Sequence, residues 1–197
     1  MGEIRSAIDI ALEKTAHIDS DGSSSAQREI KNRGKRAGSA FLDTADGELL
    51  QQAMQAANKE EGLLLIEGAL SILMAALRLP AQEEDLNKVA RIGEALQIII
   101  PQGEMKELFD QLQQILHQFL GEKSQLKQAL EQQFMPKLRA KQQELSRRYG
   151  QNIPLEPTQD PEFMATLNKN MRMLEGKYDG VLEEVRARIR EAGGISE

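Results

Sequence analysis

The chain has few of the residues on which disulfide chemistry, thiol catalysis and aromatic-rich β folds depend. Among its 197 residues there is no cysteine and no tryptophan, and there are only two tyrosines and five phenylalanines. The missing cysteine excludes disulfide scaffolds, thiol nucleophiles and cysteine-ligated metals. The scarcity of aromatic residues argues against a β-sandwich or barrel. These absences favour a helical protein whose stability comes from aliphatic side chains.

Histidine is also scarce, which limits the hydrolytic and metal sites that the chain can build. His17 and His117 are far apart in the sequence, and neither has a second histidine nearby. A zinc site needs several such ligands, and a serine triad needs a histidine and a G-x-S-x-G turn, which does not occur. A carboxylate site among Glu60, Glu61 and Glu67 has little support. We therefore expect no catalytic residue, no metal and no cofactor, and predict that the protein is not an enzyme.

The residues that are abundant predict helices. Ala, Leu, Glu, Lys and Arg make up nearly half of the chain, which is typical of long helices or coiled coils. The predicted fold class is all-α, an elongated helical bundle with long coiled-coil-like helices. The most apolar run, residues 63–79, contains Glu67 and Arg78 and is shorter than the roughly 20 residues of a transmembrane helix. Since the N-terminus also lacks the features of a secretory signal, we expect a cytoplasmic protein without a transmembrane segment.

Turn-forming residues and helix-capping residues divide the chain into six segments. A Gly/Ser-rich stretch indicates a linker after the first helix, and Asp46, Asp85 and Asp160 are placed to cap helices. The segments are an N-terminal amphipathic helix (1–18), a flexible linker and basic segment (19–45), a helical core (46–101), a long coiled-coil-like helix (102–150), a proline-containing connector (151–160) and a C-terminal helix (161–192). Breaks in the long helix are expected at residues 121–124 and at Pro136.

Apolar residues in the two long helices recur at alternating intervals of three and four, which is the pattern of a heptad seam. The seam residues are Met105, Leu108, Leu112, Ile115 and Phe119 in the first helix, and Met171, Leu174, Tyr178, Val181 and Val185 in the second. The helices either fold back as an antiparallel pair or pair with their copies in a second subunit, and the sequence does not choose. If the seam joins two chains, aspartate at Leu112 and Ile115 abolishes pairing. The pattern favours a protein-interaction or scaffold function, with a homodimer or another protein as partner.

Basic residues gather in two clusters, of which the first is a candidate binding surface for polyanions. The first is Arg28, Lys31, Arg33, Lys35 and Arg36, and the second is Lys137, Arg139, Lys141, Arg147 and Arg148. The first would neutralise phosphates of nucleic acid or of an anionic membrane, with Gly34 and Gly38 allowing close backbone approach. No aromatic residue interleaves this cluster to stack on a base, and the acidic stretch 41–85 offers internal partners. Polyanion binding through residues 28–36 is therefore the alternative function, and helix-surface solvation or salt bridging explains the second cluster.

The two ends of the chain carry a resemblance to a known family. The run from Glu3 to Thr15, EIRSAIDIALEKT, resembles the start of an uncharacterised bacterial family, a domain of unknown function whose members begin with a similar E-I-x-S-A-x-x-I-A-L-E-K run. Phe163, Leu167, Leu174, Tyr178 and Leu182 look like the last helix of that family. The resemblance implies a bacterial, cytoplasmic protein that is helical throughout, and it carries no activity or site. The glycine-containing basic segment 34–38 departs from it.

Overall fold

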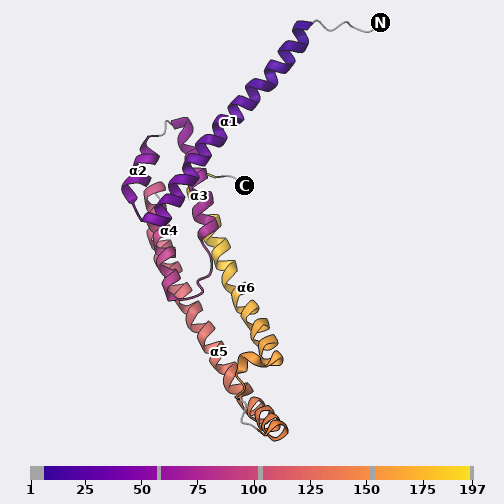
Figure 1. Ribbon diagram of the computed structural model, residues 1–197. Helices are drawn as coiled ribbons and strands as arrows, with labels where there is room; N and C mark the ends of the chain where they lie inside the picture. Colours follow the sequence, from indigo (N-terminus) through magenta and orange to yellow (C-terminus); the bar gives the residue numbers. More distant parts are fainter. Residues whose placement is uncertain (1–6, 57–58, 102–103, 151–153, 196–197) are drawn as a thin grey trace. The chain divides into compact units, whose positions relative to one another are not determined.

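The computed structural model describes the backbone of residues 7–56, 59–101, 104–150 and 154–195 (Figure 1). Side chains are described from residue 25 in the first range, from residue 61 in the second, and throughout the other two. Within these residues the structure is helical and contains no strand, so the all-α prediction is confirmed. The helices are α1 (Ala7–Thr44), α2 (Gly47–Gln55), α3 (Lys59–Ala76), α4 (Leu86–Ile99), α5 (Met105–Tyr149) and α6 (Pro161–Ala192). Two 3-10 turns, η1 (Glu83–Asp85) and η2 (Pro157–Gln159), precede α4 and α6.

The chain divides into two compact units, which we describe separately. Unit 1 comprises residues 1–77, 91–106 and 187–197, and so contains α1 to α3 with the later part of α4. Unit 2 comprises residues 78–90 and 107–186, and is built mainly from α5 and α6.

Helices α1 and α3 of unit 1 pack with their backbones close together, because glycines face the contact. A Cβ atom added at Gly34 would lie 2.0 Å from the Leu65 carbonyl oxygen. One added at Gly68 would lie 2.1 Å from the Lys31 carbonyl oxygen, so neither position has room for a side chain. The sequence interpretation that Gly34 and Gly38 admit a ligand is therefore wrong. Both glycines are buried, and the backbone that they admit is that of α3.

Large aliphatic side chains fill the rest of unit 1. The fully buried ones include Leu50 of α2, Leu65, Leu70 and Leu73 of α3, and Leu96 of α4. The Asp46 side chain accepts hydrogen bonds from the backbone N–H groups of Glu48 and Leu49, and so caps α2 as predicted. The apolar run that the sequence assigns to a buried helix thus lies in a protein core.

The Gly/Ser-rich stretch that begins the predicted linker, residues 19–25 of the segment 19–45, does not interrupt the helix. Helix α1 continues through it from Ala7 to Thr44. The segment contains one glycine, Gly22, and no proline. A glycine inside a helix costs about 1 kcal/mol relative to alanine, which does not stop a helix whose later turns are held against α3.

The long helix α5 is likewise uninterrupted, so the breaks expected at residues 121–124 and at Pro136 do not form. A proline inside a helix costs about 3 kcal/mol. It is offset here by the burial of Leu130, Phe134 and Leu138 on one face, each worth about 1.5–3 kcal/mol when fully buried. Pro136 itself is exposed.

Asp85 also differs from its predicted role as the cap of α4. It is the last residue of η1, and its carboxylate accepts hydrogen bonds from the backbone N–H groups of Ala81 and Gln82, at 2.8 and 3.1 Å. It therefore closes the turn before α4 instead of capping that helix.

Helices α5 and α6 of unit 2 run antiparallel and are joined by the short segment that contains η2 (Figure 1). The Phe119 and Tyr178 ring centroids are 5.0 Å apart, and those of Phe134 and Phe163 are 5.5 Å apart. The two ring pairs are separated by equal numbers of residues on both helices, so the helices stay in register between them. The chain thus adopts the fold-back arrangement of its two long helices.

We expect Gly68→Leu to destabilise unit 1 by about 3 kcal/mol or more, because the side chain must displace the backbone of α1. Urea unfolding followed by circular dichroism measures the change. Gly176→Ala is the matched control: its Cβ would meet nothing within 4 Å, so a gain of about 0.4–1 kcal/mol is expected from helix propensity. Equal stability of Gly68→Leu and the parent protein would contradict the close packing of α1 on α3.

Candidate functional site

The residues of the predicted heptad seams are buried or half-buried within the chain. Phe119 and Tyr178 are 1% and 3% exposed, and Leu112, Val185 and Met105 are also buried. The remaining seam residues, Leu108, Ile115, Met171, Leu174 and Val181, are half-buried. Within unit 2, Ile115 and Leu174 pack around the Phe119–Tyr178 pair. These four seam residues thus pack against one another within the chain.

A polar group closes this part of the α5–α6 contact. The Gln118 amide donates to the Glu122 carboxylate at 2.8 Å, and Lys177 Nζ lies 3.5 Å from it. Hydrogen bonds from Gln118 and then from the Tyr178 hydroxyl lower the pKa of Glu122. Burial, and then the bond to Glu122, raises the pKa of Tyr178. Glu122 is therefore held as an anion that ties α5 to α6, which is a structural role.

The first basic cluster is largely paired with acidic residues of its own chain. Lys31 Nζ lies 2.7 Å from a Glu67 carboxylate oxygen, and an Arg33 nitrogen lies 3.7 Å from Glu61. Arg36 pairs with Glu29 at 2.6 Å, while Arg28 and Lys35 are exposed. Two of these pairs join α1 to the acidic stretch on α3, which is the internal pairing that the sequence offers as the alternative to a phosphate site.

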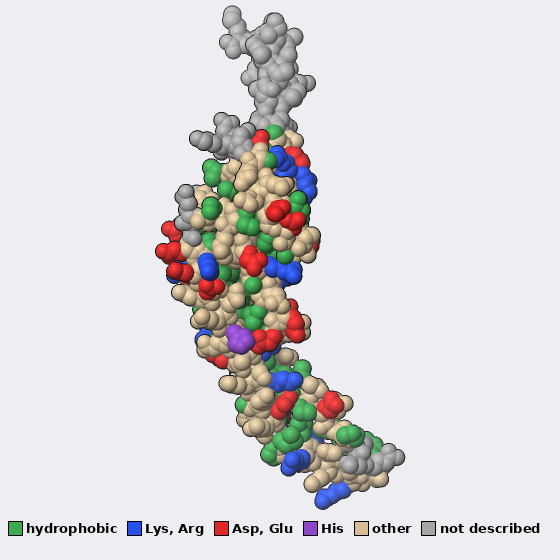
Figure 2. Space-filling model, turned by 90° about the vertical axis from the view of Figure 1, so that its left-hand side faces the viewer, with side chains coloured by type: hydrophobic (Ala, Val, Ile, Leu, Met, Phe, Trp, Pro, Cys, Tyr) green, Lys and Arg blue, Asp and Glu red, His purple; other side chains and the backbone are tan. Residues whose placement is uncertain are grey.

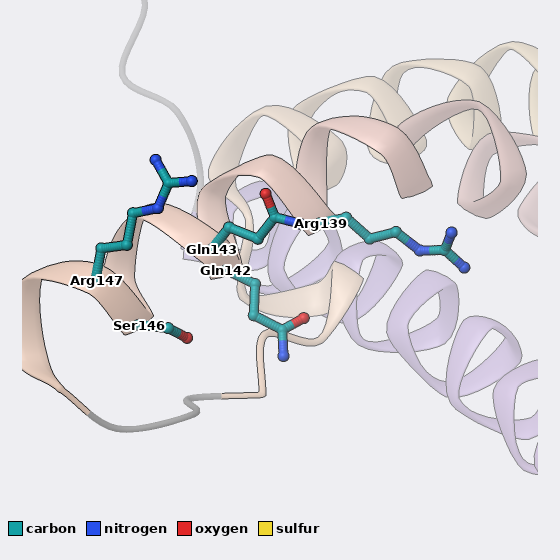
Figure 3. A pocket seen from close by; sticks show the side chains of 5 residues that line it. All are labelled: Arg139, Gln142, Gln143, Ser146 and Arg147. Carbon is teal, nitrogen blue, oxygen red and sulfur yellow. The ribbon is translucent and has the colours of Figure 1, made fainter.

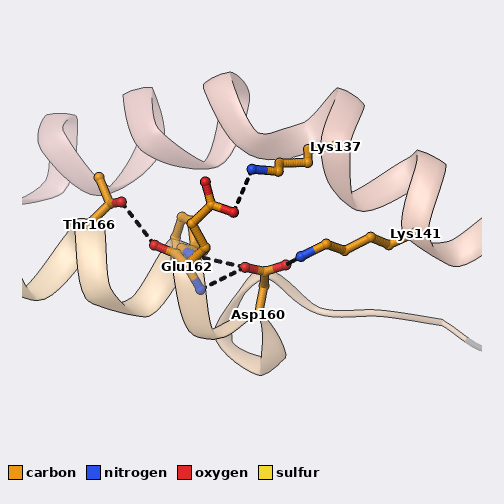
Figure 4. A network of polar contacts seen from close by, with 6 residues as sticks. Lys137, Lys141, Asp160, Glu162 and Thr166 are labelled. Carbon is orange, nitrogen blue, oxygen red and sulfur yellow. Dashed lines mark hydrogen bonds and ion pairs between the residues drawn. The ribbon is translucent and has the colours of Figure 1, made fainter.

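The second basic cluster divides into paired and unpaired residues. Lys137 forms an ion pair with Glu162, and Lys141 forms one with Asp160 (Figure 4). Among the described residues, neither Arg139 nor Arg147 forms an ion pair. The cluster is therefore only partly used in joining the helices, and Arg139 and Arg147 remain available to a ligand.

Asp160 is the buried charge at the start of α6. One of its oxygens accepts hydrogen bonds from the N–H groups of Glu162 and Phe163, at 2.9 and 3.0 Å, and the other receives Lys141 (Figure 4). The bond from Lys141, and then that from the Phe163 N–H, lowers the pKa of Asp160. The same bond to Asp160 raises the pKa of Lys141. The predicted cap of the C-terminal helix is confirmed, and it also fastens that helix to α5.

A surface depression of about 430 Å³ lies along the later part of α5. The described residues that line it all belong to α5: Arg139, Gln142, Gln143, Ser146 and Arg147 (Figure 3). Sequence analysis named the two arginines as part of a basic block and missed the two glutamines and the serine. Their spacing of three and four residues from Arg139 onward was the signal that places all five on neighbouring helix positions. A smaller depression of about 250 Å³ lies at the turn between α5 and α6, beside Lys141 and Asp160.

The histidines and the acidic trio do not assemble into a site among the described side chains. His117 Nδ1 lies 3.1 Å from Glu83 at the surface, and Glu61 and Glu67 pair with α1 as described above. His17 and Glu60 lie outside the residues whose side chains are described. In the described part of the chain, no three His, Cys, Asp or Glu side chains are grouped closely enough to hold a metal ion. None of the described helices has the length and apolar character needed to span a bilayer.

We expect Asp160→Asn to lower the urea midpoint at pH 7, because the amide cannot pair with the Lys141 ammonium. Since the folded pKa of Asp160 is depressed, its contribution is fully present above the unfolded pKa of about 4 and is lost as pH falls through the lower folded value. The difference between variant and parent should therefore shrink as the pH falls below about 4. Asp179→Asn, an exposed change on α6, is the control. A difference that does not shrink as the pH falls below about 4 would exclude the Asp160 charge as its cause.

Comparison with known proteins relates most of the chain after residue 50 to one family. The model of a family of unknown function, DUF6657, matches residues 51–191. No curated protein and no solved structure matches the chain. The match includes all of α3, α4 and α5 and nearly all of α6, and so confirms the prediction of an all-helical family of unknown function. The chain therefore belongs to the DUF6657 family.

Proposed function

We propose that the protein is a non-enzymatic interaction protein that acts in the cytoplasm and binds a protein partner through outward-facing surfaces of its helices. The observation that carries this proposal is the exposure of large apolar side chains after the seams are buried. They are 40% to 67% exposed and lie on four helices: Leu49 on α2, Leu63 on α3, Met135 and Tyr149 on α5, and Met173 on α6. Tyrosine and methionine are enriched in the cores of protein interfaces, and burying each such side chain contributes about 1.5–3 kcal/mol.

This proposal moves the binding surface from the seam to the outside of the helices. Leu112 is 1% exposed and Ile115 is half-buried, so a contact between chains along the seam requires the α5–α6 pair to open first. The exposed residues need no such rearrangement. A second copy of the chain and a different protein both remain partners that fit.

Polyanion binding through residues 28–36 has less support. Three of the five cations already have acidic partners, and the chain carries a net charge of −6. On the face drawn in Figure 2, basic and acidic side chains are interspersed. A phosphate polymer binds best where cations accumulate without acids between them.

Site-specific photo-crosslinking in the native host tests the proposal. A photoreactive amino acid replaces Leu63 or Met173 in the full chain, and exposed Gln128 of α5 is the control position. We expect a discrete protein adduct at Leu63 or Met173 that is absent at Gln128. An adduct at twice the mass of the chain identifies a second copy, and any other mass identifies a different protein. Equal labelling at all three positions, or none at any, would overturn the proposal.

The seam and the surface should respond differently to a charged residue. We expect Leu112→Asp to cost more than about 3 kcal/mol and to lower helix content, because the carboxylate is buried without a partner. Met173→Asp should change stability by less than about 0.5 kcal/mol, as surface changes do. Circular dichroism at 222 nm with urea unfolding measures both. Full helix content and unchanged stability in Leu112→Asp would show that the seam is not closed within the chain.

A further inference from the structure

We infer that one face of α5, near its C-terminal end, is a docking site for an acid-bearing helix of another protein. Five residues there follow one another at intervals of four, three, four and three, and we name them the docking stripe: Met135, Arg139, Gln142, Ser146 and Tyr149. Residues at this spacing share one helix face, and the spacing is the one at which two helices pack lengthwise. The inference rests on the proposed function and adds to it the place of binding and the chemistry of the partner.

The docking stripe is distinct from the face of α5 that packs on α6. Leu130, Phe134 and Leu138 point into the contact with Phe163 and are buried. Met135 comes directly after buried Phe134, and Arg139 comes directly after buried Leu138. One residue is a rotation of about 100° around the helix axis, so both lie away from the buried face. Met135, Arg139 and Tyr149 are exposed, and Gln142 and Ser146 are half-buried. The stripe is therefore on the surface of unit 2.

The middle of the stripe is rich in hydrogen-bond donors. Arg139, Gln142 and Ser146 line the 430 Å³ depression together with Gln143 and Arg147. In Figure 3 the Arg139 and Arg147 side chains extend in different directions from the two ends of the group, with the amides and the hydroxyl between them. Guanidinium groups donate pairs of hydrogen bonds to carboxylates. The lining therefore favours a partner that presents acceptors, carboxylates above all.

The two arginines of the lining differ in charge pairing from the lysines beside them. Lys137 and Lys141, on the neighbouring face, are neutralised by Glu162 and Asp160. Arg139 and Arg147 form no ion pair among the described residues. Eight residues separate them, which is about 12 Å along the helix axis. A partner helix with carboxylates seven or eight residues apart meets both arginines.

The ends of the stripe supply apolar anchors. Met135 stands at one end and Tyr149 at the other, where the Arg148 guanidinium lies 5.9 Å from the centre of the Tyr149 ring. Methionine, tyrosine and arginine are the residue types enriched at protein interfaces. A nucleic acid fits less well, because the paired lysines interrupt the run of cations.

The test uses the full chain and two labelled synthetic peptides as probes. Both peptides are helices of three heptads with leucine at the seam positions, and the flanking positions hold glutamate in one peptide and lysine in the other. We expect the glutamate peptide to bind in fluorescence anisotropy at low salt, and the lysine peptide not to bind. Arg139→Glu with Arg147→Glu should weaken glutamate-peptide binding roughly tenfold or more, through the loss of two charge pairs and the repulsion that replaces them.

Two further variants separate the stripe from general charge effects. Lys169→Glu with Arg172→Glu makes the same charge change at exposed positions of α6 and should leave binding unchanged. Met135→Ser with Tyr149→Ser keeps the charge and should still weaken binding. No binding of the glutamate peptide by the parent protein, or equal loss in both charge-reversed variants, would overturn the inference.

The remaining outcomes identify other occupants. Tighter binding of a mixed-sequence single-stranded oligonucleotide, lost in Arg139→Glu with Arg147→Glu, would overturn the inference in favour of a nucleic-acid site. A parent dimer in sedimentation that dissociates in the same variant would overturn it in favour of a second copy. If the glutamate peptide does not bind while crosslinks form at Leu63 or Met173, the inference of a docking site on α5 is wrong and the proposed function stands. If the crosslinks fail as well, both are wrong.

Discussion

The mutual burial of apolar residues on α5 and α6 is the interaction on which the rest of unit 2 depends. Aromatic pairs occur at two levels of this contact, Phe119 with Tyr178 and Phe134 with Phe163. Isolated helices gain little from hydrogen bonds alone in water, so helices of this length owe much of their stability to such a partner. The burial in this contact also offsets the free-energy cost of Pro136 inside α5. The contact determines which sides of both helices remain available to other molecules.

Sequence reasoning predicted the features that depend on local residue chemistry. The all-α class, the caps at Asp46 and Asp160 and the apolar helix around Leu70 follow from composition, capping side chains and periodicity, and the structure has them all. It failed where tertiary contacts outweigh a local signal. Gly22 and Pro136 are ordinary helix breakers by type, but packing elsewhere on their helices decides the outcome. The sequence left undecided which helix each seam contacts, because the same spacing suits a partner helix in the same chain or in another chain.

The two basic clusters show the same difference between what the sequence predicts and what the fold decides. The cations around Arg33 were identifiable, whereas their partners were not: Lys31 and Glu67 are 36 residues apart, and only the fold places them together. On α5 the second basic block contains five residues of one charge, two of them neutralised across the helix contact. Charge that is available for binding is thus a property of the folded chain, and the sequence supplies only an upper limit to it.

The contact between α1 and α3 also limits how unit 1 can move. Gly34 lies on the Leu65 carbonyl and Gly68 lies on the Lys31 carbonyl, so each helix has a notch that holds the backbone of the other. A shift of α1 by one residue would bring Arg33 or Lys35 onto α3, where no space for a side chain exists. Gradual sliding between these helices is therefore blocked, and a signal that passes through this pair must be carried by a rigid unit or by complete separation of the two helices.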